Sequence, residues 1–226
     1  MNSPLDNATW QALSTRQSHF NRGNEVVKYF PEEVAPFLAL EHWDEKEKKA
    51  MLECMPAGRE FFVLIARPVS LPEEVEIIRT VPVIQMVCEK LIPGTPRDIQ
   101  TQPLTPEHVP QMIELTRLTR PGPFTERTIE FGNYFGVFED GKLVAMTGER
   151  LKVNGYTEVS AICTHPAHLG KGYASHLLTQ AARRIFDSGH MPFLHVLADN
   201  TGAVELYRKK GFYTRADVYF AIFRKR

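Results

Sequence analysis

Five prolines crowd into the twenty residues from Leu91 to Pro110. Proline has no backbone N–H and fixes φ, so this density excludes both a helix and a central strand. The length of 226 residues fits one large domain or two unequal lobes. We therefore expect an amino-terminal lobe at residues 1–92, a proline-rich linker at 93–102 and a second domain at 103–226.

Composition is typical of a globular protein without a strong overall electrostatic field. Hydrophobic residues make up 43% of the chain and charged residues 24%, and the formal net charge is zero. The basic end at Arg224–Arg226 is typical of a solvated terminus. We therefore expect neither nucleic acid nor a membrane as a partner.

The cysteines and the amino terminus indicate a compartment. Cys54, Cys88 and Cys163 lie far apart and are odd in number, which favours reduced thiols over a disulfide framework. The first ten residues lack the basic and apolar segments of a signal peptide. No stretch approaches the roughly 18 apolar residues of a membrane span. The expected location is the cytoplasm.

The first lobe shows secondary-structure patterns but no chemical motif. The pattern predicts a helical start at 3–20, a mixed stretch at 24–41, a charged helix at 44–54, and strands at 61–66 and 75–87. Pro82 is expected to interrupt the second strand, because proline is confined to strand edges. We expect this lobe to be structural or to shape a pocket on the second domain.

After the linker, helix and strand patterns alternate. Thr105 is placed to cap a helix that Pro121 ends, and Gly141 suits the turn of a hairpin between strands at 134–138 and 143–147. The further predicted elements are a strand at 157–164, a helix at 171–188, a strand at 193–198, a helix at 201–210 and a final pair of strands near 212 and at 218–223. The alternation predicts an α/β fold, arranged as an α+β sandwich.

The stretch THPAHLGKGYASHLL joins a strand that ends at Thr164 to the start of a helix. Gly170, Gly172 and the small Ala174 let the backbone approach a ligand closely. The first amides of a helix have no internal partner and the helix dipole adds positive character. The turn therefore suits a pyrophosphate, with Lys171 as a further charge. Two glycines alone are equally typical of a plain tight turn, and a Walker A loop is excluded because glycine follows the lysine.

The next strand and helix make the pattern specific. In ADNTGAVELYRKKGF, the second half of the GNAT signature (Asn-x-x-Ala, then Tyr, then Gly-Phe) is matched by Asn200, Ala203, Tyr207, Gly211 and Phe212. The turn at 169–174 resembles the first half, Arg/Gln-x-x-Gly-x-Gly/Ala, except that Leu169 stands where the family usually has Arg or Gln. From about Pro103 onward the chain resembles the GNAT superfamily of N-acetyltransferases. The resemblance implies a mixed, mostly antiparallel central sheet flanked by helices.

The resemblance also implies acetyl-CoA, or another short acyl-CoA, as co-substrate. The strand backbone at Ile162, Cys163 and Thr164 would pair with the pantetheine arm, and Asn200 would also reach it. The pyrophosphate would be held by amides of the loop, at Gly170, Lys171, Gly172, Tyr173, Ala174 and Ser175.

Acyl transfer from a thioester to an amine needs an acid for the departing thiolate and a base for the amine. The resemblance implies Tyr207 as the acid, and a core aromatic is the alternative for this residue. Two residues compete as base or water relay. Glu158 matches the position of the base in the histone-acetylating branch, and His195 matches its position in the ribosomal-protein-acetylating branch. Strand alternation alone does not orient these two side chains.

No metal site is expected. Cys163, His165 and His168 form a C-x-H-x-x-H pattern, but no fourth ligand lies at a zinc-like spacing and the pattern overlaps the cofactor turn.

The layout of a lobe ahead of a GNAT domain is similar to that of glycine N-acyltransferase-like members. The expected activity is transfer of an acetyl or short acyl group from acyl-CoA to a primary amine of a small molecule, amino acid or peptide, by direct attack in a ternary complex. The alternative is a non-catalytic acyl-CoA-binding protein that keeps the fold. Acceptor choice is expected to lie in loops such as 117–127. The sequence leaves the acceptor and the oligomeric state open.

Overall fold

The computed structural model of the protein describes residues 3–94 and 98–226. The helices and 3₁₀ turns (η) are η1 (Pro4–Asn7), α1 (Ala8–Ser14), η2 (Ser18–Phe20), α2 (Glu45–Cys54), η3 (Pro106–His108), α3 (Val109–Thr119), η4 (Thr128–Phe131), η5 (Pro166–His168), α4 (Tyr173–Asp187) and α5 (Thr201–Lys209). The strands are β1 (Val27–Tyr29), β2 (Leu38–Leu40), β3 (Glu60–Ile65), β4 (Val75–Cys88), β5 (Gln102–Pro103), β6 (Phe135–Glu139), β7 (Lys142–Val153), β8 (Tyr156–Thr164), β9 (Met191–Leu197) and β10 (Phe212–Lys225).

One sheet of eight strands organises the molecule, in the order β3-β10-β4-β9-β8-β7-β6-β5. Neighbouring strands are antiparallel except β8 and β9, which are parallel. Met146 of β7 belongs to the buried cluster of Met112 in α3, whereas the adjacent Ala145 belongs to that of Leu177 in α4. Adjacent strand residues point to opposite faces, so the two helices cover opposite faces of the sheet. The expected mixed, mostly antiparallel sheet flanked by helices is confirmed.

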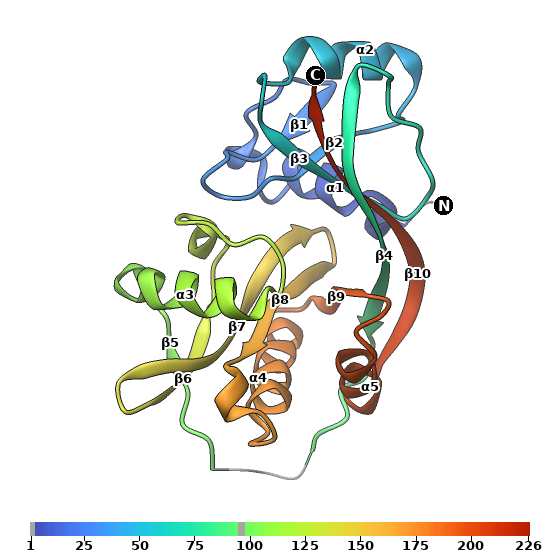
Figure 1. Cartoon of the computed structure of the whole chain (residues 1–226). Helices are drawn as coiled ribbons and strands as arrows, with labels where there is room; N and C mark the ends of the chain where they lie inside the picture. The colour runs from blue at the N-terminus through green and yellow to red at the C-terminus, as the bar shows by residue number, and fades with distance from the viewer. Residues whose placement is uncertain (1–2, 95–97) are drawn as a thin grey trace.

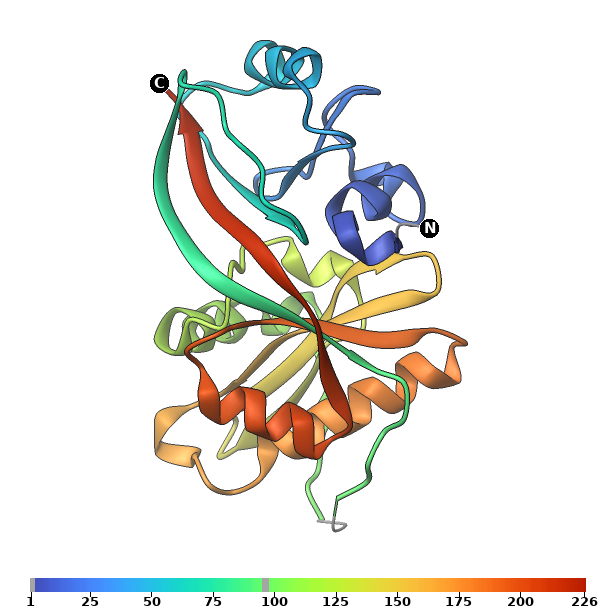
Figure 2. The same ribbon diagram turned by 90° about the vertical axis from the view of Figure 1, so that its right-hand side faces the viewer.

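β4 and β10, with 14 residues each, pair along almost their whole length. In Figures 1 and 2 both strands run from the layer of β1, β2 and α2 to the region of α5. The prediction of a final pair of strands near 212 and at 218–223 is wrong, because β10 is continuous. A register shift between Thr214 and Ala216 accommodates the irregular residues without ending the strand.

β4 continues through Pro82, where the sequence predicted an interruption. Within the described residues, β9 pairs with β4 only from Val83 to Val87, and the Ala198 amide directly after β9 donates to the Pro82 carbonyl at 3.0 Å. Pro82 therefore lies where the β4–β9 ladder ends, and the end of a ladder tolerates the missing N–H of proline. The predicted helical start at 3–20 is divided into η1, α1 and η2, and the mixed stretch at 24–41 contains the β1–β2 hairpin.

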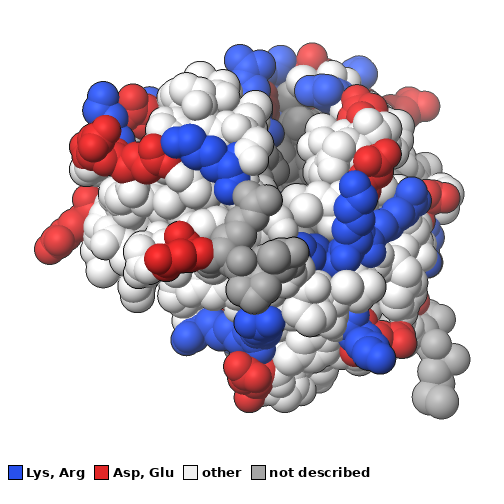
Figure 3. Space-filling view, turned by 90° about the horizontal axis from the view of Figure 1, so that it is seen from below, with Lys and Arg blue, Asp and Glu red and all other residues white. Residues whose placement is uncertain are grey.

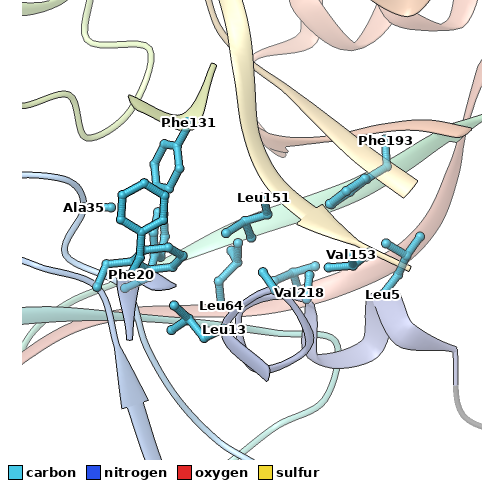
Figure 4. Close-up of a cluster of buried hydrophobic side chains, with 14 of the residues drawn as sticks. Leu5, Leu13, Phe20, Ala35, Leu64, Phe131, Leu151, Val153, Phe193 and Val218 are labelled. Carbon is cyan, nitrogen blue, oxygen red and sulfur yellow. The ribbon is translucent and has the colours of Figure 1, made fainter. Parts of the chain in front are cut away.

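Residues from both sides of the linker share a hydrophobic core (Figure 4). The labelled members ahead of the linker are Leu5, Leu13, Phe20, Ala35 and Leu64, and those after it are Phe131, Leu151, Val153, Phe193 and Val218. The sheet is shared in the same way, because β3 and β4 precede the linker and pair with β10 and β9, which follow it. The predicted division into lobes at residues 93–102 is thus crossed by both the sheet and the core.

The charge of the surface and the length of the helices relate to the prediction that nucleic acid and membranes are not partners. On the face seen from below, Lys and Arg side chains are interspersed with Asp and Glu (Figure 3), as the net charge of zero would suggest. Across residues 3–94 and 98–226, none of the helices has the length and apolar character needed to span a bilayer.

Candidate active site

A pocket opens where two neighbouring strands of the sheet separate. β8 and β9 pair in parallel only from Tyr156 opposite Met191 to Glu158 opposite Phe193. Beyond that point a pocket of about 670 Å³ is lined by the ends of both strands and by parts of β3, β4, α3, α5 and β10. Ala161 has φ of 52° and marks a bulge in β8 opposite β7. The bulge breaks the alternation expected for β8 and alters which of its residues face the pocket.

The glycine turn after β8 has the backbone geometry that the sequence predicted. Gly170 has φ of 77° and Gly172 has φ of 84°, a region that favours glycine. A Cβ added at Gly170 would meet no atom within 4 Å, so the turn is open. Gly172 is the N-cap of α4 and offers no side chain to its first amides. An anion can therefore reach these amides and the positive end of the helix dipole.

Lys171 holds the turn to the sheet. Its Nζ donates to Oε1 (2.9 Å) and Oε2 (2.8 Å) of Glu139 at the end of β6, and the Tyr173 hydroxyl donates to the same carboxylate. The hydrogen bonds from Lys171 and Tyr173 lower the pKa of Glu139 to about 2. The Lys171 ammonium group is thus ion-paired with Glu139. Leu169, at the position where Arg or Gln was expected from the resemblance, is 67% exposed.

Tyr207 on α5 lines the pocket beside β8. Its side chain belongs to the core cluster of α4 and α5, and the residue is 7% exposed. Burial, with a smaller effect of Cys163, raises the pKa of Tyr207 to about 12, so the phenol is neutral. None of the described residues hydrogen-bonds to its hydroxyl. The hydroxyl is thus available to a ligand.

Two further polar groups at the pocket came from the sequence prediction. Asn200 is the N-cap of α5, and its Oδ1 accepts from the Ala203 amide at 3.2 Å, which leaves the side-chain NH₂ for another partner. The Thr164 Oγ1 is buried and has no hydrogen-bond partner among the described residues. A buried hydroxyl without a partner is costly, so a ligand that supplies one would be stabilised there.

Glu158, one of the two predicted bases, lies beneath the pocket and does not line it. The Arg150 guanidinium binds it through two hydrogen bonds, at 2.8 and 2.5 Å, and the Leu151 amide adds a third at 3.2 Å. Burial alone would raise the pKa of Glu158, but Arg150 and then His195 outweigh burial and lower it to about 2. A carboxylate that binds protons so weakly and is 0% exposed is poorly placed to deprotonate an amine.

His195, the other predicted base, lines the pocket and contacts Glu158 directly. Its Nδ1 lies 2.7 Å from Oε1 of Glu158, and its Nε2 lies 3.0 Å from Nε2 of Gln85. A carboxylate only accepts and an amide nitrogen only donates, so Nδ1 carries the proton and Nε2 keeps its lone pair. Arg215 donates to Gln85 Oε1 at 2.7 Å, which fixes the orientation of the amide. The imidazole is therefore held as one neutral tautomer.

Arg150, Gln85 and Arg215 are site residues that the sequence prediction did not include. Gln85 is 1% exposed, and its Nε2 also donates to the Leu5 carbonyl at 3.0 Å. A signal for Gln85 was present: it is a lone polar residue inside the apolar strand run VIQMV, and buried polar groups require partners. Arg150 and Arg215 carry no comparable signal. Arginines in strands are usually exposed, so the sequence does not show that these two contact the site.

The predicted absence of a metal site concerns Cys163, His165 and His168. Burial raises the pKa of the Cys163 thiol to about 12, with weaker opposite effects from Thr119 and Met146. His165 accepts from the Ala167 amide, and His168 lies beside Glu139 and Lys171. Across the part of the chain that the structure describes, no group of three or more His, Cys, Asp or Glu residues is arranged to hold a metal ion.

Known proteins share this architecture. A crystal structure assigned by its name to a GNAT-family acetyltransferase of Novosphingobium aromaticivorans covers 100% of both chains, with 29% identity and a TM-score of 0.91. A GCN5-related N-acetyltransferase of Kribbella flavida covers 96% of this chain and 95% of its own, with 16% identity and a TM-score of 0.64. A GNAT-family acetyltransferase of Colwellia psychrerythraea covers 100% and 98%, with 14% identity and a TM-score of 0.53. The last two show the fold alone.

A sequence comparison agrees with the structural one. The family described as FR47-like protein matches residues 134–221, a segment from the start of β6 into β10 that contains the glycine turn and Tyr207. A comparison with curated protein sequences found no significant match. Residues 134–221 therefore match the FR47-like family, a GNAT-type domain, and the whole chain is similar in fold to a GNAT-family acetyltransferase.

Proposed function

We propose that the protein transfers an acetyl or other short acyl group from acyl-CoA to a primary amine by direct attack in a ternary complex. One observation carries the proposal: a single pocket joins Tyr207, His195 and Asn200 to the last residues of β8, which lead into the open glycine turn. Acid, candidate base and cofactor-binding groups are thus in one place, as acyl transfer to an amine requires.

The residues present fit an acyl-CoA. The pyrophosphate would lie on the amides of Gly170 to Ser175, where α4 begins and the turn is open at Gly170. The pantetheine would follow β8 at Ile162, Cys163 and Thr164, where β9 has separated and where the Thr164 hydroxyl has no described partner. Asn200 would donate its free amide hydrogens to the same arm. When bound, acyl-CoA supplies the activated thioester carbonyl that an amine can attack.

Tyr207 would stabilise the departing sulfur. Its pKa of about 12 lies roughly 3.5 units above the thiol value of about 8.5, so complete proton transfer would be uphill by roughly 5 kcal/mol. A neutral phenol instead donates a hydrogen bond to the thiolate as its charge develops, and this bond is strong in a site that excludes water. The proton follows once solvent reaches the product.

His195 is our proposed proton acceptor, with Glu158 as the residue that positions it. Support comes from its place in the pocket and from Glu158, which holds Nδ1–H and leaves the lone pair on Nε2. That lone pair is bonded to Gln85, so the amine or a water must displace the Gln85 amide before the proton moves. The imidazolium formed would be stabilised by the Glu158 carboxylate. The sequence-based preference for Glu158 itself is not supported by its burial.

The three cysteines are unpaired, which supports a reducing compartment such as the cytoplasm.

Thiol release from acetyl-CoA, measured with and without a panel of primary amines, tests the activity. The proposal expects release that depends on both acetyl-CoA and an amine and that disappears in His195→Gln. Calorimetry of acetyl-CoA binding, run in parallel, distinguishes an enzyme from a protein that only binds acyl-CoA. Binding of acetyl-CoA without thiol release from any amine would identify a non-catalytic acyl-CoA-binding protein. An active His195→Gln protein would mean that the amine arrives neutral and is only oriented by the enzyme.

A further inference from the structure

Strands that run between the two layers of the molecule form the outer part of the pocket. Across β3, β10 and β4, Phe62 pairs with Ile222 and Ile222 with Arg79, and all three line the pocket. The next row inward consists of Leu64, Phe220 and Val81. These two rows make an apolar wall with one guanidinium at its outer end.

The apolar wall continues into the part of the pocket that contains the candidate catalytic residues. Val83 of β4 pairs with Leu197 of β9, and both line the pocket. Arg79 lies six residues before Gln85, the strand partner of His195, which is roughly 20 Å along a strand. An acceptor whose amine lies near His195 would therefore extend along the apolar wall toward Arg79.

A second arginine stands on another side of the pocket. Arg120 follows α3 directly, in the loop that continues through Pro121 and Gly122, and all three residues line the pocket. Its φ of 51° and ψ of 52° lie in the left-handed region, where glycine is usual after a helix. A large charged residue thus occupies a position where glycine is usual.

The charge balance of the pocket is one-sided. Three arginines line it, and no Asp or Glu is among the described residues that do so. Arg150 is paired with Glu158, but Arg79 and Arg120 are exposed. Within the described part of the chain, neither of these two has an ion-pair or hydrogen-bond partner. Two guanidinium groups are therefore available to an anion beside an apolar surface.

We infer, building on the proposed acyl transfer, that the acceptor is a primary amine that carries an apolar body and a carboxylate remote from the amine, such as a short peptide of apolar residues. Guanidinium groups bind carboxylates through paired hydrogen bonds, and Phe62, Phe220 and Ile222 bury the apolar part. A polycationic acceptor is repelled by the same arginines. Their positive charge also favours the neutral form of the bound amine, which is the form that attacks the thioester.

Two matched pairs of acceptors test the inference in the whole protein. Trileucine and tetraleucine are each compared with their C-terminal amides. The members of each pair differ only in a carboxylate remote from the amine, so that amine basicity is nearly the same. Thiol release with acetyl-CoA is measured for the wild type and for Arg79→Gln and Arg120→Gln. Arg117→Gln is the control, because Arg117 is an exposed arginine of α3 outside the pocket.

The inference expects a kcat/KM at least tenfold higher for the carboxylate member of one or both pairs. Arg79→Gln or Arg120→Gln should reduce that preference severalfold or more, with acetyl-CoA affinity unchanged, and Arg117→Gln should not. Equal use of both members, or a preference that survives both pocket substitutions, would overturn it. So would binding of acetyl-CoA without turnover of either carboxylate acceptor. A protein that fails to bind acetyl-CoA in calorimetry would instead overturn the proposed function.

Discussion

Arg150 and Glu158 place two opposite charges inside the protein at the base of the pocket. Glu158 is fully buried and Arg150 is nearly so, and two hydrogen bonds join them. Such a pair gains little stability relative to an apolar core, but the loss of one partner leaves the other charge buried and unpaired. Glu158 also holds Nδ1 of His195, so this single carboxylate supports both the fold and the orientation of the imidazole.

Glu158→Gln is expected to lower the free energy of unfolding by about 3 to 5 kcal/mol, because the Arg150 charge stays buried without a counter-charge. Urea denaturation at neutral pH measures the change. Glu130→Gln is the matched control, since Glu130 forms a similar ion pair with Arg127 that is exposed to solvent. That control should cost less than about 1 kcal/mol. Equal losses in the two variants would mean that burial of the Arg150–Glu158 pair has no special energetic weight.

The loss of stability in Glu158→Gln is expected to depend on pH. In the fold, burial raises the pKa of Glu158, but Arg150 and His195 outweigh burial and lower it to about 2, whereas an unfolded glutamate titrates at about 4.3. Because the folded value is the lower one, its stabilisation is present above about pH 5 and is lost as the pH falls through about 2. The difference in unfolding free energy between wild type and Glu158→Gln should therefore shrink over this range. A difference that stays constant would contradict the lowered pKa.

At the scale of elements, the turn between β8 and α4 is the feature on which cofactor binding depends. Its glycines have backbone angles that a side chain rarely adopts, and its amides lie at the start of a helix. A bulky residue there would stand between the ligand and the backbone.

Gly170→Val is expected to weaken acetyl-CoA binding by tenfold or more, about 1.4 kcal/mol, because the β-branched side chain blocks the close approach. Gly189→Val is the control at the other end of α4, since both glycines have nearly the same φ (77° and 78°) and neither would bring its Cβ within 4 Å of another atom. Both variants should lose similar stability through backbone strain, and only the first should lose affinity in calorimetry. Unchanged affinity in a folded Gly170→Val protein would remove the pyrophosphate assignment.

Local signals decided which elements could be predicted from the sequence. The predicted helix at 44–54 became α2, capped by Asp44, and the predicted helix at 171–188 became α4, because a cap or a glycine and a periodic apolar face lie within the segment itself. The continuity of β10 could not be predicted, since its bulge is stabilised by pairing with β4, more than 120 residues earlier. The contact between Glu158 and His195 depends likewise on the parallel pairing of β8 with β9 and on its end at Phe193.

At the scale of the whole molecule, the two sides of the proline-rich segment form one structure. β4 lies between β9 and β10, and residues of α1 pack in the same core as Phe193. The sequence correctly indicated the fold of the carboxy-terminal half, whose motifs are local. The contribution of the amino-terminal residues had no local signal, because Phe62, Arg79 and Gln85 acquire their roles only through the shared sheet. The pocket is thus assembled by both halves, with the chemistry on one side and the apolar wall on the other.

The central claim, that this pocket carries out acyl transfer with Tyr207 at the sulfur, is tested most directly by the kcat of thiol release in Tyr207→Phe. The account predicts a fall of about 10²- to 10³-fold, the usual scale for one preorganised hydrogen-bond donor, with acetyl-CoA affinity nearly unchanged. The phenylalanine ring keeps the packing of Tyr207 in the α4–α5 core, so the fold should be preserved. A kcat equal to that of the wild type would contradict the claim.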